Sequence, residues 1–412
     1  MIHQSINIKD YDYGLPDERI ALFPTEPRDA SKLLIGRPDG LISDDIFRNL
    51  PSYLPEDSIL IFNETRVVHA RLLFQKLTGA QIEVFCLGPA GDREINQALS
   101  SPSPVRWKTL IGGAKRWKEG RLMLNFDTRE GLQGILYAEK ISRQNEIFEV
   151  EFEWHPSRLS FAEVLNAAGQ IPLPPYIHRE ATNQDEDRYQ TVYARVNGSV
   201  AAPTAGLHFT DEVFEKLEKK NIVKQRVILH VGAGTFRPVE ASDVRAHRMH
   251  EEEYVIERKT IEYLLNHLNQ IKILVGTTTV RTMESLYLAG KRLLSGLPFD
   301  QAVHIEQWDA YQGPFPDPAE SLEAILNNLH SLGTDSIKGT TRLMIVPGFH
   351  FRFTDILITN FHQPRSTLLL LVAAFYGDDW KKAYQYALDN NFRFLSYGDA
   401  CLFFRKPFDL LP

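Results

Sequence analysis

Short apolar runs that end in polar residues recur toward both ends of the chain and predict buried strands. The runs are 58–62, 227–231, 273–276 and 356–359. Helix-like segments at 210–220 and 260–269 lie between some of them, and an apolar run at 367–375 indicates a buried helix. This alternation of strands and helices predicts an α/β fold.

The middle of the chain has a different pattern. Between Val67 and Trp154, short runs alternate apolar and polar residues and are separated by glycine-containing breaks. Clear examples are 81–85, 121–125 and 146–152. Such spacing is typical of an antiparallel sheet or a small β-barrel of its own.

Two further segments carry local signals. Residues 160–169 resemble a capped helix, and the prolines of 171–175 impose an extended, rigid segment after it. The stretch 295–341 is long and rich in proline and aromatic residues, but its part from Asp317 onward looks helical. We therefore interpret it as a small inserted element.

Composition limits the class of protein. With 43% hydrophobic and 24% charged residues, the chain is an ordinary globular protein, long enough for two domains. Its two cysteines, Cys86 and Cys401, are far apart and predict neither a disulfide nor a cysteine-based zinc site. The acidic start does not resemble a secretory signal, and 367–375 is too short to span a membrane. We expect a cytoplasmic protein without a membrane partner.

The net charge of −7 gives no overall attraction to nucleic acid. Binding of RNA then requires a local cluster of cations, and one short stretch offers it. Its members are Lys108, Lys115, Arg116, Lys118 and Arg121. A solvated hairpin face with scattered charges is the equally weighted alternative.

Four loops that leave predicted strands carry polar residues that a core would not select, as active-site loops of α/β proteins do. They contain His208 with Thr204, His230 with glycines at alternate positions, the threonine cluster 277–279, and Asn360 with His362. The helix after the threonine cluster could hold an anion at its N-terminus, with Arg281 and Glu284 on one face. One histidine alone is usually structural, whereas four in such settings favour a shared site.

His247 and His250 stand beside three glutamates and suggest a metal site. Their spacing of three is not the helical zinc arrangement, and the mixture of oxygen and nitrogen ligands fits no particular metal. A hydrogen-bonding role toward substrate is the better interpretation, and we assign no metal.

Taken together, these segments resemble the S-adenosylmethionine:tRNA ribosyltransferase-isomerase (QueA) family. The matching segments are 27–34, 62–66, 189–193, 198–209, 229–236, 247–250, 276–281, 347–349, 359–362 and 394–399. They follow the family order from end to end. The chain departs from the family pattern at His69, Gln363 and Arg365, and in the length of 295–341.

The resemblance implies a mixed α/β main domain built from residues 1–66 and 155–412, with a β-barrel domain at 67–154 inserted in it. It implies transfer of the ribosyl part of S-adenosylmethionine to 7-aminomethyl-7-deazaguanine at the tRNA wobble position. Isomerisation then gives epoxyqueuosine and releases adenine and methionine. S-adenosylmethionine would be consumed as a substrate, without a further cofactor, by an enzyme that we expect to be monomeric.

The resemblance also indicates site residues. The acid and base are expected among His208, His230, His250 and His362, without individual assignment, because imidazole titrates near neutral pH. Asp399 would receive the aminomethyl nitrogen, Arg66 and Arg281 a carboxylate or phosphate, and Phe209 or Phe361 would stack on a base. The other expected substrate-binding residues are Thr204, Gly232, Gly234, Thr235, Thr278, Glu284, Asn360 and Tyr397.

Two further expectations concern RNA and alternatives. The tRNA would dock on Lys108, Lys115, Arg116 and Lys118, with Lys381, Lys382 and Arg393 on the same side as the cleft. A non-catalytic tRNA-binding paralogue is the main alternative, although the chain keeps every motif histidine. An ordinary methyltransferase is disfavoured, because no glycine-rich loop follows the first strand.

Overall fold

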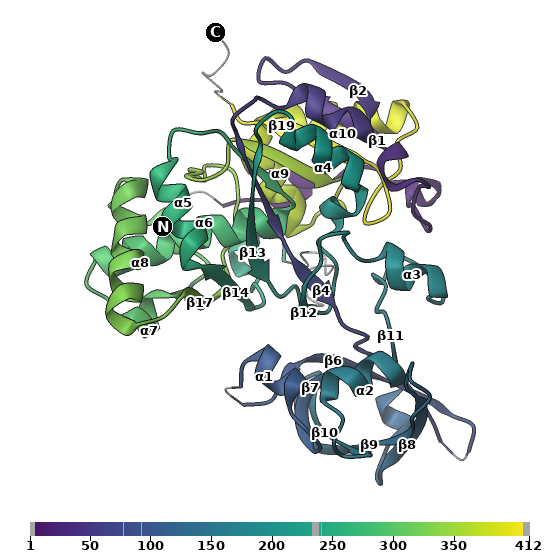
Figure 1. The fold of residues 1–412 in the computed structure, drawn as a ribbon. Helices are drawn as coiled ribbons and strands as arrows, with labels where there is room; N and C mark the ends of the chain where they lie inside the picture. The colour runs from purple at the N-terminus through teal and green to yellow at the C-terminus, as the bar shows by residue number, and fades with distance from the viewer. Residues whose placement is uncertain (1–4, 77, 92, 233–238, 240, 407–412) are drawn as a thin grey trace.

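The computed structural model describes residues 5–76, 78–91, 93–232, 239 and 241–406. Within this part, ten strands form one mixed sheet to which both ends of the chain contribute (Figure 1). In spatial order they are β16 (His304–Ile305), β17 (Ser336–Thr341), β14 (Glu252–Glu257), β13 (Val223–Leu229), β3 (Ile59–Asn63), β15 (Lys272–Val275), β18 (Ile356–Asn360), β19 (Ala400–Phe404), β1 (Lys32–Gly36) and β2 (Ile42–Ile46). Strands β13, β3, β15 and β18 are parallel, so their carboxyl ends lie at one edge.

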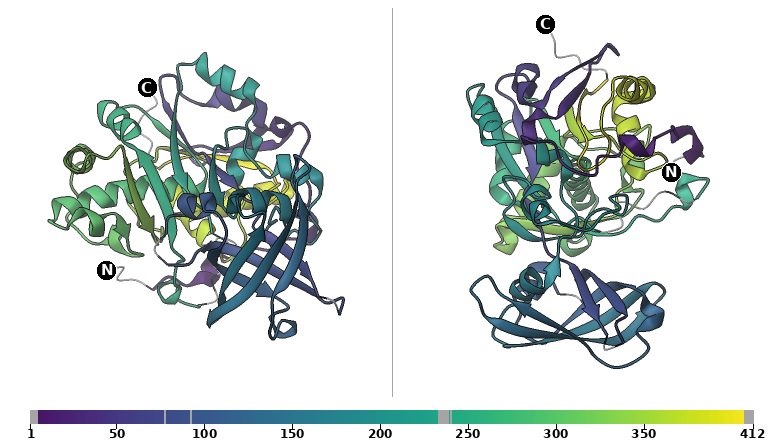
Figure 2. Two further views of the ribbon diagram at one scale, coloured as in Figure 1. Left: turned by 60° about the horizontal axis from the view of Figure 1, so that its bottom comes forward. Right: turned by 90° about the vertical axis from the view of Figure 1, so that its right-hand side faces the viewer.

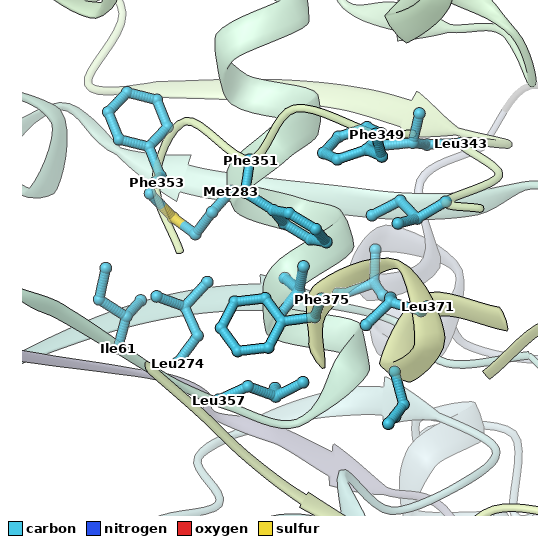
Figure 3. Close-up of a cluster of buried hydrophobic side chains, with 14 of the residues drawn as sticks. Ile61, Leu274, Met283, Leu343, Phe349, Phe351, Phe353, Leu357, Leu371 and Phe375 are labelled. Atoms are coloured by element: carbon cyan, nitrogen blue, oxygen red, sulfur yellow. The ribbon is translucent and has the colours of Figure 1, made fainter. Parts of the chain in front are cut away.

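Helices cover both faces of this sheet. One face carries α5 (Arg258–Asn266), α6 (Thr277–Leu294), α8 (Pro318–Leu332), α9 (Thr367–Tyr376) and α10 (Trp380–Asp389), and the other carries α4 (Asp211–Glu218). Successive strand residues point to opposite faces. Leu274 and Leu357 therefore pack toward Met283 and Phe375 (Figure 3), whereas Ile273 belongs to the core under α4.

The second large sheet is antiparallel and curled (Figure 2). Its strands are β11 (Gly169–Gln170), β5 (Arg71–Gln75), β6 (Gln81–Pro89), β7 (Val105–Gly112), β10 (Ile147–His155), β9 (Gln133–Gln144) and β8 (Leu122–Asp127). The chain thus has a mixed α/β fold, and the change of pattern at Val67 coincides with the start of the curled sheet.

The core of the curled sheet continues past the expected boundary at Trp154. Helix α2 (Phe161–Ala168) places Phe161 and Leu165 in this core, and β11 pairs with β5. The alternating pattern ends at β10, but α2 covers the apolar core of the curled sheet. The curled sheet and its core therefore extend to Gln170, beyond the change of pattern at Trp154.

The two sheets are joined by a short parallel pair of strands, β4 (Thr65–Val67) and β12 (Val196–Ser199). This pair brings the segment after β3 beside the segment that leads to His208, although the curled sheet separates them in sequence. The amide of Asn63 binds the backbone of Leu229 on both sides, which fixes the ends of β3 and β13 to each other.

Local helix signals identified the helices well. Ser160 and Glu163 form a capping box at α2, Thr210 caps α4, and Asp317 with Glu320 begins α8. The expected element at 295–341 is integrated rather than separate, because β17 pairs with β14 and α8 contributes to the main core.

The remaining elements are short. They are α1 (Ile95–Ser100), α3 (Asn183–Arg188), α7 (Phe299–Ala302) and the 3₁₀ helices η1 (Ile8–Tyr11), η2 (Asp17–Arg19), η3 (Arg28–Ala30), η4 (Phe47–Tyr53), η5 (Ala114–Arg116), η6 (Thr204–His208), η8 (Val244–Ala246), η9 (Asp309–Tyr311) and η10 (Gly377–Asp379). None of the described helices is long and apolar enough to cross a membrane.

Candidate active site

A cleft lies at the carboxyl ends of the parallel strands, with an empty volume of about 620 Å³ that includes its part open to solvent. All four expected loops contribute to its wall, and the loop after β13 does so through Val231. The principal lining residues are Tyr176, Ala202, Thr204, Val231, Gly276, Thr277, Thr278, Thr359, Asn360, His362, Gln363, Ser366 and Ser396. Hydroxyl, amide and imidazole groups therefore converge on one cavity.

His362 is the expected histidine that lines this cleft. Its Nε2 lies 2.9 Å from Thr359 Oγ1, and its backbone amide donates to the Tyr384 hydroxyl at 3.1 Å. Burial lowers the pKa of His362 to about 3. The ring is therefore neutral at neutral pH, because burial disfavours its protonated form.

His208 lies one residue behind the wall. Its Nδ1 is 2.8 Å from Ser31 Oγ, and its Nε2 is 3.3 Å from Asn360 Nδ2. Asn360 in turn accepts a hydrogen bond from Thr204 Oγ1 at 2.7 Å. If the amide donates to Nε2, the Nδ1 proton of His208 points to Ser31. Burial lowers its pKa to about 3, so a polar chain leads from a neutral imidazole to the cleft.

His230 is buried between β4 and β12. Its Nδ1 lies 3.2 Å from Thr65 Oγ1, and burial lowers its pKa to about 4. The ring packs so closely on Gly198 that a Cβ at that position would lie 2.6 Å from it. His230 thus holds the junction of the two sheets, and its neighbour Val231 reaches the cleft.

His250 belongs to a separate ionic cluster. Its Nε2 lies 3.0 Å from Glu252 Oε1, whose carboxylate also pairs with Arg281 and accepts the Gly232 amide at 3.2 Å. Glu252 is buried and, although burial opposes ionisation, Arg281, His250 and the hydrogen bonds lower its pKa to about 2. Three expected segments therefore meet at one carboxylate.

Glu252 is a residue that sequence analysis did not single out. The signal was present, because β14 alternates and Glu252 shares the buried face with Tyr254 and Ile256. A carboxylate on that face required a buried partner, which is Arg281. Arg281 is thus used within the protein and not as the expected free anion ligand, although its Nη2 has no hydrogen-bond partner among the described residues.

Of the four histidines expected to share a site, His362 is the one among the described residues that line this cleft. His208 is connected to it through Asn360, whereas His230 and His250 lie outside its lining. Sequence spacing placed the four loops at one sheet edge, but the direction of each side chain depended on the packing of its loop.

Two expected carboxylates bind the protein's own backbone. Glu284 accepts the amides of Arg352 and Phe353 and the hydroxyl of Thr354, and burial raises its pKa to about 7. Asp399 accepts the amides of Lys32 and Arg393 at 2.8 and 2.7 Å, and burial raises its pKa. Neither lines the cleft. Both carboxylates therefore bind the protein's own groups in this structure, and their expected roles toward substrate stay predictions.

The two phenylalanines expected to stack on a base differ in their position relative to the cleft. Phe209 is fully buried against Phe47 and Phe214, so the expected stacking of Phe209 on a base is corrected. Phe361 borders the cleft, but its ring packs on Tyr384 and Phe394. The cleft's own aromatic side chain is Tyr176, whose hydroxyl lies 2.5 Å from Ser396 Oγ.

The other expected ligands are dispersed. Arg66 is exposed on β4, and the Tyr397 hydroxyl donates to Asp185 at 2.6 Å. Gly234 and Thr235 lie outside the described residues. No group of three histidine, cysteine or acidic side chains suited to a metal ion occurs in the described part of the chain.

The expected RNA-binding cations are exposed on the curled sheet. Lys115 and Lys118 line an open groove together with Lys140 and Arg143, which sequence analysis did not include. Lys108 and Arg116 are also exposed, as are Lys381 and Lys382 on α10. The Arg393 guanidinium instead binds Thr25 and the Phe23 carbonyl.

A mixed sheet with a cleft at the carboxyl ends of its parallel strands is the arrangement of many ligand-binding α/β proteins. A family described as queuosine biosynthesis protein matches residues 8–403. The chain belongs to this family, that of the S-adenosylmethionine:tRNA ribosyltransferase-isomerases.

The similarity to individual relatives extends over almost the whole chain. The S-adenosylmethionine:tRNA ribosyltransferase-isomerase of Azoarcus sp. (strain BH72) is 38% identical over 98% of this chain and 99% of its own length. That of Aromatoleum aromaticum is 39% identical over 96% and 97%. The crystal structure of S-adenosylmethionine tRNA ribosyltransferase from Thermotoga maritima shares 30% identity, with 96% and 99% covered and a TM-score of 0.46.

Proposed function

We propose that this chain transfers the ribosyl moiety of S-adenosylmethionine to 7-aminomethyl-7-deazaguanine at the tRNA wobble position. It then isomerises the ribosyl moiety to the epoxycyclopentane of epoxyqueuosine, with release of adenine and methionine. The observation that carries the proposal is the cleft, where loops of the family-matching segments join His362, Asn360 and Thr204 in one wall. The near-complete length of the match to named relatives supports the same reaction.

The cleft offers the acid–base groups that such a reaction needs. A base must remove a proton beside the sulfonium, and a proton must reach adenine as it leaves. His362 is neutral, buried and on the wall, so we assign it first as the base; once protonated, it can serve as the acid. His208 is assigned to orient Asn360, because its Nε2 lies 3.3 Å from that amide and it is not among the residues that line the cleft.

The remaining wall residues would hold the ribose and exclude water. Thr204 and Thr359 carry hydroxyl groups already fixed by Asn360 and His362, so they are oriented before substrate binds. Because the positive sulfur acidifies the adjacent carbon, the proposed proton removal needs no electron-withdrawing cofactor.

We further propose that the curled sheet is a β-barrel domain inserted into a discontinuous α/β domain, and that tRNA docks on it. The exposed Lys115 and Lys118, with Lys140 and Arg143 in the same groove, support this proposal. They provide local positive charge on a chain whose net charge is −7.

The test is to incubate the protein with S-adenosylmethionine and precursor-bearing tRNA and to follow adenine and methionine by mass spectrometry. We expect both products in equal amounts, with a matching mass increase of the tRNA. Binding of tRNA without any adenine release would instead support a non-catalytic paralogue.

A further inference from the structure

The start of helix α6 is the strongest electrostatic feature of the cleft. Among the described residues that line it, none is Lys, Arg, Asp or Glu. Helix α6 comprises eighteen residues, and its first turn lies in the wall through Thr277 and Thr278. Because a helix carries partial positive charge at its N-terminus, this turn favours an anionic group in an otherwise uncharged cleft.

No side chain satisfies the amides of this turn. The first amides of a helix have no intrahelical acceptor, and Gly276 at the N-cap has no side chain to replace one. No described residue accepts a hydrogen bond from the amides of 277–279. Helix α9 also begins at the cleft, but there Ser366 accepts the Leu369 amide at 3.2 Å.

Thr278 provides an independent observation. The residue is 8% exposed, and its hydroxyl has no hydrogen-bond partner among the described residues. The hydroxyl groups of Thr279 and Thr282, on the same helix, donate to backbone carbonyls at 2.5 and 2.9 Å. The Thr278 hydroxyl lies beside the helix start, because a Cβ on Gly276 would be 3.4 Å from it. A buried hydroxyl without a partner is unfavourable unless a ligand provides one.

We propose that the start of α6, together with the Thr278 hydroxyl, binds the carboxylate of the methionine portion of S-adenosylmethionine. This inference rests on the proposed function, because it assigns one part of that substrate to one part of the cleft. The two oxygens of a carboxylate can accept from the first-turn amides and from the hydroxyl at once. A tRNA phosphate offers similar anion chemistry, but no Lys or Arg is among the described residues that line the cleft at the start of α6.

The experiment measures the binding of two ligands without tRNA. Titration calorimetry gives the Kd of S-adenosylmethionine and of its decarboxylated analogue for the parent and for Thr278→Val. We expect Thr278→Val to weaken S-adenosylmethionine binding roughly tenfold and binding of the analogue less than about twofold. Thr282→Val is the matched control, because its hydroxyl binds only the helix backbone, and it should leave both values unchanged.

A second variant guards against a folding effect. Thr278→Ser keeps the hydroxyl and should bind S-adenosylmethionine as the parent does. In the parent alone, the analogue should also bind more weakly than S-adenosylmethionine. Equal affinities for the two ligands, or equal losses for both in Thr278→Val, would overturn the inference.

Further measurements distinguish a carboxylate from an RNA phosphate at this turn, and failure of this inference from failure of the proposed function. Weaker tRNA binding by Thr278→Val, with unchanged S-adenosylmethionine binding, would assign an RNA phosphate to this turn and overturn the carboxylate. A parent that discriminates between the two ligands but releases no adenine with tRNA would overturn the proposed function alone. A folded parent that does not bind S-adenosylmethionine would overturn both.

Discussion

The cleft of the mixed sheet and the face of the curled sheet use polar residues in opposite ways. In the cleft, His362, Asn360 and Thr204 are buried or half-buried, uncharged and bonded to specific partners. On the curled sheet, charged side chains of both signs are exposed, as in the pair Arg106 and Glu151. Burial fixes the protonation state and orientation of a few groups in the cleft. On the exposed face, solvent screens the charges, so each ion pair contributes little to stability.

The largest expected difference concerns pH. The pKa values of buried His208 and His362 are lowered to about 3, and that of His230 to about 4, whereas unfolded histidines titrate near 6.5. Below pH 6.5 the unfolded chain binds more protons, so each histidine removes up to about 1.4 kcal/mol of stability per pH unit. Glu284, with its pKa raised to about 7, offsets one of the three.

The lowered pKa values of the three histidines outweigh the raised pKa of Glu284, so these four groups should make stability fall as the pH drops from 6 to 4.5. Hydrogen exchange, corrected for its intrinsic pH dependence, measures this loss of stability. As the pH falls, protection should decrease in the mixed sheet at a higher pH than in the curled sheet, which carries none of these three histidines. Equal loss of protection in both sheets would contradict the contrast between them.

The next effect is expected at Glu252. Glu252→Gln leaves Arg281 buried without a charged partner, which should lower the free energy of unfolding by about 3 kcal/mol. Denaturant titration measures this change. Glu251→Gln is the matched control, because this neighbour pairs with Arg342 at the surface and should change stability by less than about 1 kcal/mol. If both variants lose a similar free energy of unfolding, the buried carboxylate contributes no more to stability than the exposed one.

A smaller effect, on turnover, is expected at His362. His362→Ala removes the proposed base and should lower kcat by about 100-fold, measured as adenine release per folded molecule. His330→Ala, on the exposed side of α8, is the control and should retain the parent rate. If His362→Ala retains the parent kcat, another group is the base.

The smallest effect is expected on the curled sheet. Reversing Lys115 and Arg116 to glutamate should weaken tRNA binding roughly tenfold and should leave S-adenosylmethionine binding unchanged. Binding of tRNA by the parent should also weaken as salt is added. Reversing the exposed Lys219 and Lys259 on the α/β part serves as the control in filter-binding measurements. Unchanged affinity of the first variant would exclude this face as the docking surface.

Local sequence determined the elements and their order. The predicted helix starts at Ser160, Thr210 and Asp317 are confirmed, and the structure shows that each of these side chains caps its helix. The change of pattern at Val67 located the curled sheet, because alternation is a property of each strand. The loops at the strand ends, and the motifs that carry the family resemblance, were likewise readable from the chain.

Tertiary structure decided which of these residues reach the cleft. His362 lines it while His208 lies behind Asn360, and Glu252 joins Gly232, His250 and Arg281, although no spacing in the sequence encodes these contacts. The closing of the curled sheet's core by α2 also lay beyond the alternating pattern. Side-chain direction and partner choice depend on packing between segments far apart in the chain, and that packing exists only once the sheets have formed.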